Sequence, residues 1–257
     1  MDLRISGKRA LITGATTGIG RATALALTAE GVQVAIAGRN EALLAALRDE
    51  ISASGAPTPT AIAADITTVD GTDRVVDEAQ HALGRIDILV NNAGGSRPRP
   101  ESDAGSTNDA WWDEAFALNF SAARRITEGL LPGMKAAGWG RIVTLTGAMT
   151  QRRINAASPA KAALWSWSRS LSAELAPHGI TVNCIAPGRI NTPQITGRLF
   201  PTEEARRAEI SQSIPMGRFG EPEELAALVA FLASEAAGYI TGAQVPVDGG
   251  MIRMAMP

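Results

Sequence analysis

The sequence is poor in the residues from which metal sites and disulfides are built. Its 257 residues include one cysteine, Cys184, and two histidines, His81 and His178, which lie far apart in the chain. A single cysteine excludes an internal disulfide and any multi-thiolate metal site, as is typical of a protein from a reducing cytoplasm. A histidine-based metal site would need several carboxylates grouped with a histidine, and we recognise no such grouping, so we expect no metal site.

Long apolar runs and blocks of like charge are also missing. Nowhere do 18 apolar residues follow one another, and residues 1–7 contain no apolar run of signal-peptide length. The 24 Lys and Arg residues nearly balance the 26 Asp and Glu residues, and neither sign forms a long block. We therefore expect a soluble, cytoplasmic protein with neither a nucleic-acid nor a membrane partner.

Short β-rich runs alternate with longer helical patterns along the chain. Several strand-like runs, such as 86–90, are almost wholly apolar, as expected when helices cover both faces of a parallel sheet. The pattern predicts an α/β Rossmann fold, a single doubly wound domain over residues 1–257 with seven strands. Strands are expected at 9–13, 32–37, 59–64, 86–90, 141–145, 181–185 and 245–247, and helices at 19–30, 41–54, 69–83, 109–135, 159–176 and 222–233.

Two irregular stretches interrupt this alternation. Residues 94–108 are rich in Pro, Ser and Gly and are expected to form a surface loop at the rim of the site. Residues 188–201 follow the carboxyl end of a strand, where open α/β sheets bind ligands. Together with the short helical pattern behind them, they predict a substrate loop at about 188–215.

The first expected strand ends in a glycine-rich turn that opens the first helix. The turn reads Thr13-Gly14-Ala15-Thr16-Thr17-Gly18-Ile19-Gly20. Glycines permit a tight turn and a close approach to a diphosphate, and the helix N-terminus offers unpaired N–H groups. Because the turn lies in a βαβ unit, it favours dinucleotide binding over a bare structural turn. The residues expected to bind are Gly14, Thr16, Thr17, Gly18, Ile19 and Gly20.

The end of the second expected strand indicates which dinucleotide is bound. Here the sequence reads Ala37-Gly38-Arg39-Asn40, without the acidic residue that would bind the 2′-hydroxyl of NAD. An arginine can pair bidentately with a 2′-phosphate, so Arg39 predicts a preference for NADP. The alternative is that Arg39 only begins the next helix as a solvated residue.

Further segments carry the motifs of one enzyme family. Asn91-Asn92-Ala93-Gly94 follow the fourth expected strand, Asn119 stands in Ala117-Leu118-Asn119-Phe120, and Pro187-Gly188 precede Ile190 and Thr192. With the glycine turn, Gly238-Tyr239-Ile240-Thr241-Gly242 and Val247-Asp248-Gly249-Gly250, these motifs resemble the short-chain dehydrogenase/reductase family over nearly the whole chain.

The resemblance implies a fold, an activity and a set of residues. The implied strand order is 3-2-1-4-5-6-7, and the implied assembly is a homodimer or homotetramer built on the long fourth and fifth helices. Asn119 and Lys161 are the implied catalytic residues, and Lys161 would also bind the nicotinamide ribose. The remaining implied cofactor contacts are Asp65, Ile66, Asn92, Ala93, Gly94, Pro187, Gly188, Ile190 and Thr192.

The catalytic centre departs from the family pattern. The family places a tyrosine four residues before the lysine, where this sequence has Ala157 before Lys161. The position of the family's serine after the fifth strand is taken by Gly147. The only tyrosine, Tyr239, lies far downstream, so two of four catalytic groups are missing.

Three functions remain open. The first is an NADP-dependent oxidoreductase acting on a small carbonyl or alcohol substrate, since orientation of the reactants contributes more than the lost acid. Its proton would come from water, from Lys161, or from the hydroxyl of Ser158, Thr146 or Thr150. The second is a redox-inactive NADP-binding regulatory or partner protein. The third is a non-redox lyase or isomerase that uses the pocket with different groups. For Lys161, action as a Schiff-base amine is an alternative to ribose contact, and ribose contact is favoured.

Overall fold

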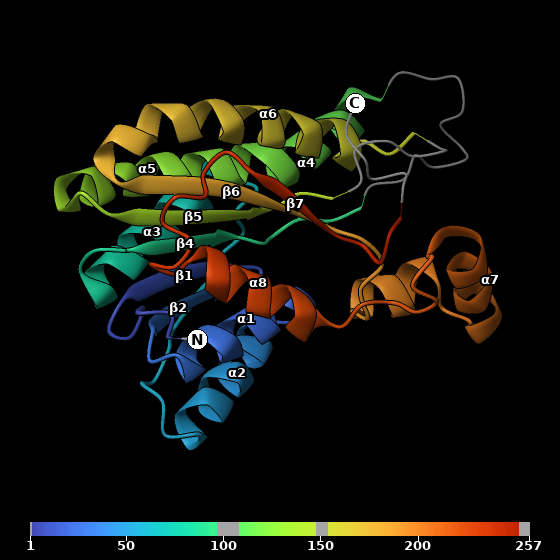
Figure 1. The fold of residues 1–257 in the computed structure, drawn as a ribbon, viewed down its shortest axis with the longest axis horizontal. Coiled ribbons are helices and arrows are strands. Elements are labelled where there is room, and N and C mark those ends of the chain that lie inside the picture. The colour runs from blue at the N-terminus through green and yellow to red at the C-terminus, as the bar shows by residue number, and fades with distance from the viewer. Residues whose placement is uncertain (1, 97–107, 148–153, 252–257) are drawn as a thin grey trace.

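The computed structural model describes residues 2–96, 108–147 and 154–251, which form a seven-stranded parallel sheet with helices on both faces (Figure 1). The strand order is β3-β2-β1-β4-β5-β6-β7, which confirms the predicted doubly wound Rossmann fold and the order implied by the resemblance. The strands are β1 (Arg9–Thr13), β2 (Gln33–Gly38), β3 (Thr60–Ala63), β4 (Ile88–Asn91), β5 (Gly140–Leu145), β6 (Ile180–Pro187) and β7 (Gln244–Val247).

Two helical layers cover the sheet. In Figure 1, α1, α2 and α8 lie on one face, and α3, α5 and α6 lie on the other. The α-helices are α1 (Gly18–Ala29), α2 (Glu41–Ala53), α3 (Val69–Leu83), α4 (Asp109–Phe116), α5 (Ala122–Ala137), α6 (Ala157–Leu175), α7 (Glu203–Ser213) and α8 (Pro222–Leu232). Shorter turns are η2 (Ala117–Ser121), η3 (Ala176–His178) and η4 (Ile195–Leu199).

The two layers explain why the central strands are apolar at consecutive positions. Successive strand residues point to opposite faces of a sheet. Ile12 and Ile88 therefore pack in the cluster under α1, α2 and α8, while Leu11 and Leu89 pack in the cluster under α3, α5 and α6. All four side chains are fully buried.

One expected helix is wrong. The pattern at 109–135 predicted a continuous helix, but the structure has α4 and α5 separated by the π-helical turn η2. The backbone N–H of Ala122 donates to the carbonyl of Ala117, five residues earlier instead of four. One extra residue in a turn leaves the apolar pattern on both sides intact, so periodicity does not reveal it. Such turns often occur at functional sites, and this one contains Asn119.

The predicted irregular stretches have different outcomes. The segment 188–201 contains the π-helical turn η4, and α7 follows within the expected substrate loop. Most of the 94–108 loop lies outside the described residues, as does Thr150. The expected homodimer or homotetramer on the helices at 109–135 and 159–176 stays a prediction.

A buried carboxylate joins the amino ends of β1 and β4. The side chain of Asp87 is 1% exposed and accepts hydrogen bonds from Arg9 Nε and Arg85 Nε, each at 2.8 Å. It also accepts from the backbone N–H of Arg9 at 3.0 Å. Burial alone would raise the pKa of Asp87, but the bonds from Arg9 and Arg85 outweigh it and leave the pKa below its ordinary value. Asp87 therefore acts as an ionised clamp at the end of the sheet away from its carboxyl edge.

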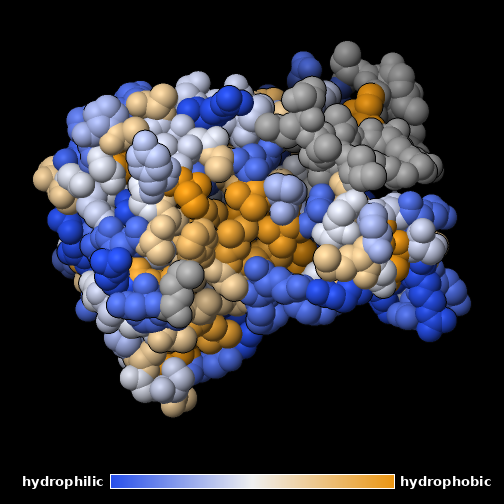
Figure 2. Space-filling model, viewed as in Figure 1, coloured by the Kyte–Doolittle hydropathy of each residue, from blue (hydrophilic) through white to orange (hydrophobic). Residues whose placement is uncertain are grey.

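One face of the molecule carries an apolar area. Figure 2 shows hydrophobic side chains gathered at the centre of the view, where α8 and β7 lie. The partly buried side chains Leu228, Phe231 and Val247 come from these two elements and pack on the core below them. Within the described residues, no helix is both long and apolar enough to cross a membrane.

Candidate functional site

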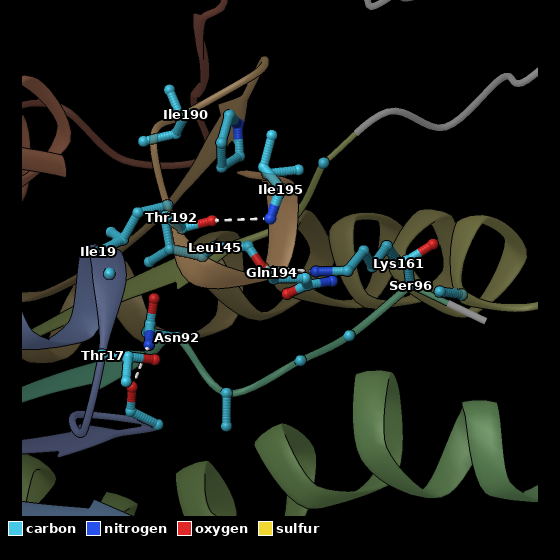
Figure 3. Close-up of a pocket in the computed structure, with 18 of the residues that line it drawn as sticks. Thr17, Ile19, Asn92, Ser96, Leu145, Lys161, Ile190, Thr192, Gln194 and Ile195 are labelled. Carbon is cyan, nitrogen blue, oxygen red and sulfur yellow. Dashed lines mark hydrogen bonds between the residues drawn. The ribbon is translucent and has the colours of Figure 1, made fainter. Parts of the chain in front are cut away.

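A cavity of 930 Å³ opens at the carboxyl ends of the parallel strands. It is bounded by the turn after β1, the end of β2, the residues after β3, β4 and β5, the start of α6, and the segment after β6. Figure 3 shows Thr17 and Asn92 in one part of this cavity and Lys161 and Ser96 in another. Thr192, Gln194 and Ile195, from the segment after β6, also line the cavity. This is the edge at which open α/β sheets bind ligands.

The glycine turn lies against the loop after β4. Gly14 has φ +65°, a left-handed conformation that favours glycine, and a Cβ there would lie 2.9 Å from the Cα of Ala93. The side-chain amide of Asn92 donates to the carbonyls of Thr13 and Gly14 at 3.0 and 2.9 Å and so holds the turn. A Cβ at Gly20 would overlap both the Gly14 carbonyl oxygen and Asn92 Nδ2.

The helix behind this turn begins without a side-chain cap. Thr17 has the extended backbone of an N-cap residue, but its side chain makes no capping hydrogen bond, and the first turn of α1 holds no acidic residue. The first N–H groups of the helix and its positive dipole end thus face the cavity without a competing anion. This arrangement is suited to a diphosphate.

Sixteen of the expected cofactor residues line the cavity. They are Gly14, Thr16, Thr17, Gly18, Ile19, Arg39, Asp65, Ile66, Asn92, Ala93, Gly94, Lys161, Pro187, Gly188, Ile190 and Thr192. Gly20 and Asn119 do not line it. Gly20 provides close packing behind the glycine turn, and Asn119 is buried in η2. The binding roles of all these residues stay predictions.

Arg39 and Asp65 lie at the β2 and β3 side of the cavity. Helix α2 begins after Arg39, at Glu41, and its cap is Asn40, whose side chain accepts from Leu43 N. Arg39 is therefore not the first residue of a helix, and it is exposed and forms no ion pair with any described residue. Hydrogen bonds from the backbone and hydroxyl of Thr67, with a smaller contribution from Arg39, lower the pKa of Asp65.

The segment after β6 crosses the glycine turn. A Cβ at Gly18 would lie 2.7 Å from Thr192 Cγ2, so the Thr192 methyl group lies directly on the turn. Arg189 and Glu209 also line the cavity and form an ion pair at 2.8 Å, with Arg189 stacked on Phe200 at 5.1 Å. This pair connects the strand end to α7.

Sequence reasoning did not single out several residues of this outer part. The cavity wall also includes Leu118, Gln194, Ile195, Leu199, Phe200, Glu209, Gln212, Ser213 and Met251. All of them except Leu118 and Met251 fall within the substrate loop predicted at about 188–215, so their segment was predicted but not their side chains. Met251 follows the Val247-Asp248-Gly249-Gly250 motif, which was the only available signal for it.

Lys161 points into the cavity from the second turn of α6. Its Nζ donates to the Thr146 carbonyl at 2.7 Å and to the Leu145 carbonyl at 3.4 Å. A Cβ at Gly94 would lie 3.1 Å from Lys161 Nζ and 3.0 Å from Asn119 Oδ1. Glycine at this position therefore leaves room for both side chains beside the backbone of residue 94. Asn119 Oδ1 accepts from Gly95 N at 2.9 Å.

No phenol lies beside this lysine in the described part of the cavity wall. Ala157, one helical turn before Lys161, is 4% exposed and lines the cavity. Gly147 also lines it, at a φ of +152° that favours glycine. Tyr239 is fully exposed in the turn before β7 and so lies at the opposite end of the sheet.

Comparison with known proteins gives the family of this chain. Residues 14–252 match the family described as enoyl-(acyl carrier protein) reductase. The short-chain reductase protein NovJ of Streptomyces niveus is 37% identical over 94% of this chain and 92% of its own length. The chain belongs to the short-chain dehydrogenase/reductase family. The 3-oxoacyl-[acyl-carrier-protein] reductase FabG of Aquifex aeolicus is 35% identical over 98% of this chain and 100% of its own length.

The family membership extends to solved structures. L-sorbose reductase from Gluconobacter frateurii, complexed with NADPH and L-sorbose, matches with a TM-score of 0.92 and 33% identity, over 99% of this chain and 100% of that one. The fold of this short-chain reductase is thus shared over 99% of the chain.

Proposed function

We propose that this chain is an NADP-dependent oxidoreductase that interconverts a small carbonyl compound and its alcohol. The observation that carries the proposal is that one continuous cavity joins an uncapped helix N-terminus and Arg39 to the ammonium of Lys161. The bound cofactor would supply a hydride. The chain's own residues would bind the diphosphate at the N–H groups of α1 and hold the nicotinamide ribose with Lys161.

The other cavity residues fit the remaining parts of the cofactor. Asp65 and Ile66 would contact the adenine. Pro187, Gly188, Ile190 and Thr192 would hold the nicotinamide amide, and Asn92, Ala93 and Gly94 would form the floor beneath the dinucleotide. These assignments are supported by the position of each residue on one continuous wall.

We expect Arg39→Ala to weaken NADPH binding about 10-fold to 100-fold, because a charge-assisted hydrogen bond contributes roughly 1.5–3 kcal/mol. NADH, which lacks the 2′-phosphate, should bind the variant and the wild type alike. Isothermal titration calorimetry with both cofactors measures the change. Arg48→Ala is the matched control, since Arg48 pairs with Asp49 on the surface of α2. An equal loss of affinity for NADH would contradict the assignment.

The substrate end of the cavity is mixed in character. It presents Leu118, Leu199 and Phe200 together with Gln194, Gln212 and the Arg189–Glu209 pair. Relatives named for reduction of 3-oxoacyl groups and of L-sorbose suggest two substrate types to try first. The test is NADPH oxidation, followed by absorbance, with a 3-oxoacyl thioester, L-sorbose and a panel of ketones and aldehydes. Binding of NADPH without oxidation by any of them would reject the proposal.

A redox-inactive NADP-binding protein is the second candidate, favoured by Ala157 and Gly147 beside Lys161. We expect Ala157→Tyr to lower turnover about 10-fold or more, because the ring would fill the space in which the substrate carbonyl must meet Lys161. Steady-state kinetics at saturating NADPH measure this, with Ala157→Ser as the small-residue control. Activity that arises only in Ala157→Tyr would favour the second candidate. Gly147→Ser is less informative, since the backbone at 147 disfavours a side chain.

A further inference from the structure

The ammonium of Lys161 does not use all of its N–H groups in hydrogen bonds to the described residues. An ammonium has three N–H groups. The bond to Thr146 O at 2.7 Å is strong, while the contact with Leu145 O at 3.4 Å is near the limit of a hydrogen bond. Lys161 lines the cavity, and the neighbouring positions 147 and 157 carry only Gly and Ala. At least one N–H can therefore be offered to a group that enters the cavity.

Few other groups on the described wall can give up a proton. Its titratable side chains are Arg39, Asp65, Lys161, Arg189 and Glu209. Arginine does not lose its proton in proteins. The pKa of Asp65 is lowered, and Glu209 already accepts from Arg189, so both are acceptors.

The hydroxyl groups near Lys161 are poorer candidates. Thr146 Oγ1 donates to Ile185 O at 3.1 Å and accepts from Gln244 Nε2, so its proton is already used. Ser96 and Ser158 line the cavity, but an alkyl hydroxyl releases a proton far less readily than an ammonium. Among the described residues, the wall thus offers one group of suitable acidity at the centre of the site.

The surroundings of Lys161 also adjust its acidity. Burial away from water lowers the pKa of Lys161 from 10.5 to about 8. The described residues packed against it, from the end of β5, the loop after β4, η2 and its own helix, contain no acid or base within contact. The other charged side chains of the described wall, Arg39, Asp65 and the Arg189–Glu209 pair, lie at other parts of it. At neutral pH the ammonium is therefore the main form, and it can lose its proton easily.

We propose that Lys161 is itself the general acid of the reaction and protonates the substrate oxygen directly, in the space that Ala157 and Gly147 leave open. This proposal rests on the proposed function. The hydride would come with its electron pair from a C–H bond of the reduced nicotinamide, which breaks and leaves the nicotinamide oxidised. The hydride would bond to the carbonyl carbon, and the π pair of the C=O bond would move to the oxygen. That oxygen forms a bond to a proton from Nζ, whose N–H bond breaks. The neutral amine then takes a proton from solvent.

The acidity of Lys161 can be measured without any substrate. The chain contains three lysines, Lys8, Lys135 and Lys161. In protein labelled with ¹³C at lysine Cε, the double variant Lys8→Arg and Lys135→Arg leaves one signal, that of Lys161. We expect this signal to titrate with a midpoint near pH 8. A midpoint at or above the ordinary lysine value of about 10.4 would overturn the acid role.

Kinetics then separate the acid role from a purely binding role. With a substrate found in the panel, wild-type kcat/KM should fall tenfold per pH unit above about pH 8, because the amine form cannot donate. Lys161→Arg keeps the positive charge but not the labile proton, so kcat at saturating NADPH should fall about 100-fold or more. The fall in kcat/KM above about pH 8, the alkaline limb of the profile, should vanish. Lys135→Arg, on the surface of α5, is the matched control.

The outcomes distinguish the two proposals. If Lys161→Arg keeps both the wild-type kcat and the fall in kcat/KM above about pH 8, the acid role is overturned but the proposed function is not. Cofactor binding without turnover in the wild type would overturn the proposed function and the acid role with it. NADPH affinity, followed by quenching of tryptophan fluorescence, shows for each variant whether a loss lies in binding or in the proton transfer.

Discussion

Gly20→Ala is expected to weaken NADPH binding about 100-fold and to destabilise the fold by roughly 1–3 kcal/mol. The added Cβ would overlap the Gly14 carbonyl oxygen, which is backbone, and Asn92 Nδ2, which is held by hydrogen bonds to the carbonyls of Thr13 and Gly14. The helix would have to move away from the turn, and its N–H groups would no longer converge on one diphosphate. Calorimetric titration with NADPH measures the loss.

The control for this experiment is Gly133→Ala in α5. A Cβ there meets only Arg85 Cγ at 3.6 Å, an ordinary contact, and alanine is favoured in a helix. Cofactor affinity should be unchanged and stability equal or higher. Wild-type affinity in Gly20→Ala would mean that the dinucleotide is not bound by this turn.

Asp87→Ala is expected to lower the free energy of unfolding by about 2–3 kcal/mol at neutral pH. The substitution removes the acceptor of two arginine side chains and of the backbone N–H of Arg9. The loss stays below that of a wholly buried pair, because Arg9 and Arg85 are 25% and 40% exposed and can reach water. Urea denaturation measures the difference. Asp49→Ala, whose carboxylate is 69% exposed, is the control and should change little.

The effect of Asp87→Ala should also depend on pH. The folded-state pKa of Asp87 lies below the ordinary value of 3.8, so its contribution is complete above that value and is lost as pH falls through the lowered pKa. The difference between wild type and variant should therefore be constant from neutral pH down to about pH 4 and shrink below it. A difference that grows with acidification would contradict the clamp.

The sequence predicted the sheet and the edge at which the cavity opens because both depend on local patterns. Apolar strands without alternation identify a sheet covered on both faces, and a glycine turn between β1 and α1 identifies the helix N-terminus that faces the cavity. The strand order itself came from the resemblance, since periodicity does not define which strands are neighbours. Boundaries differed by a few residues, as for β4, expected at 86–90 and found at Ile88–Asn91.

The remaining part of the site depends on contacts between distant residues. The pairing of Arg189 with Glu209, 20 residues apart, brings α7 to the cavity, and no sequence period predicts it. The π-helical turn was invisible because it inserts one residue without changing the apolar stripe on either side. Asn119 was singled out from a motif, and its catalytic role stays a prediction. Its side chain donates to Ala115 O and accepts from Gly95 N, an orientation that depends on that turn and that no motif predicts.

The contact of Thr192 with Gly18 bears on the order of events during turnover. The same segment that walls the substrate end lies over the turn where the diphosphate would be held. A dinucleotide in that position would be covered by this segment, and so would a substrate beside Lys161. Residues 188–200 would then have to move before either the coenzyme or the substrate could enter or leave, so exchange at the two ends of the cavity would be coupled.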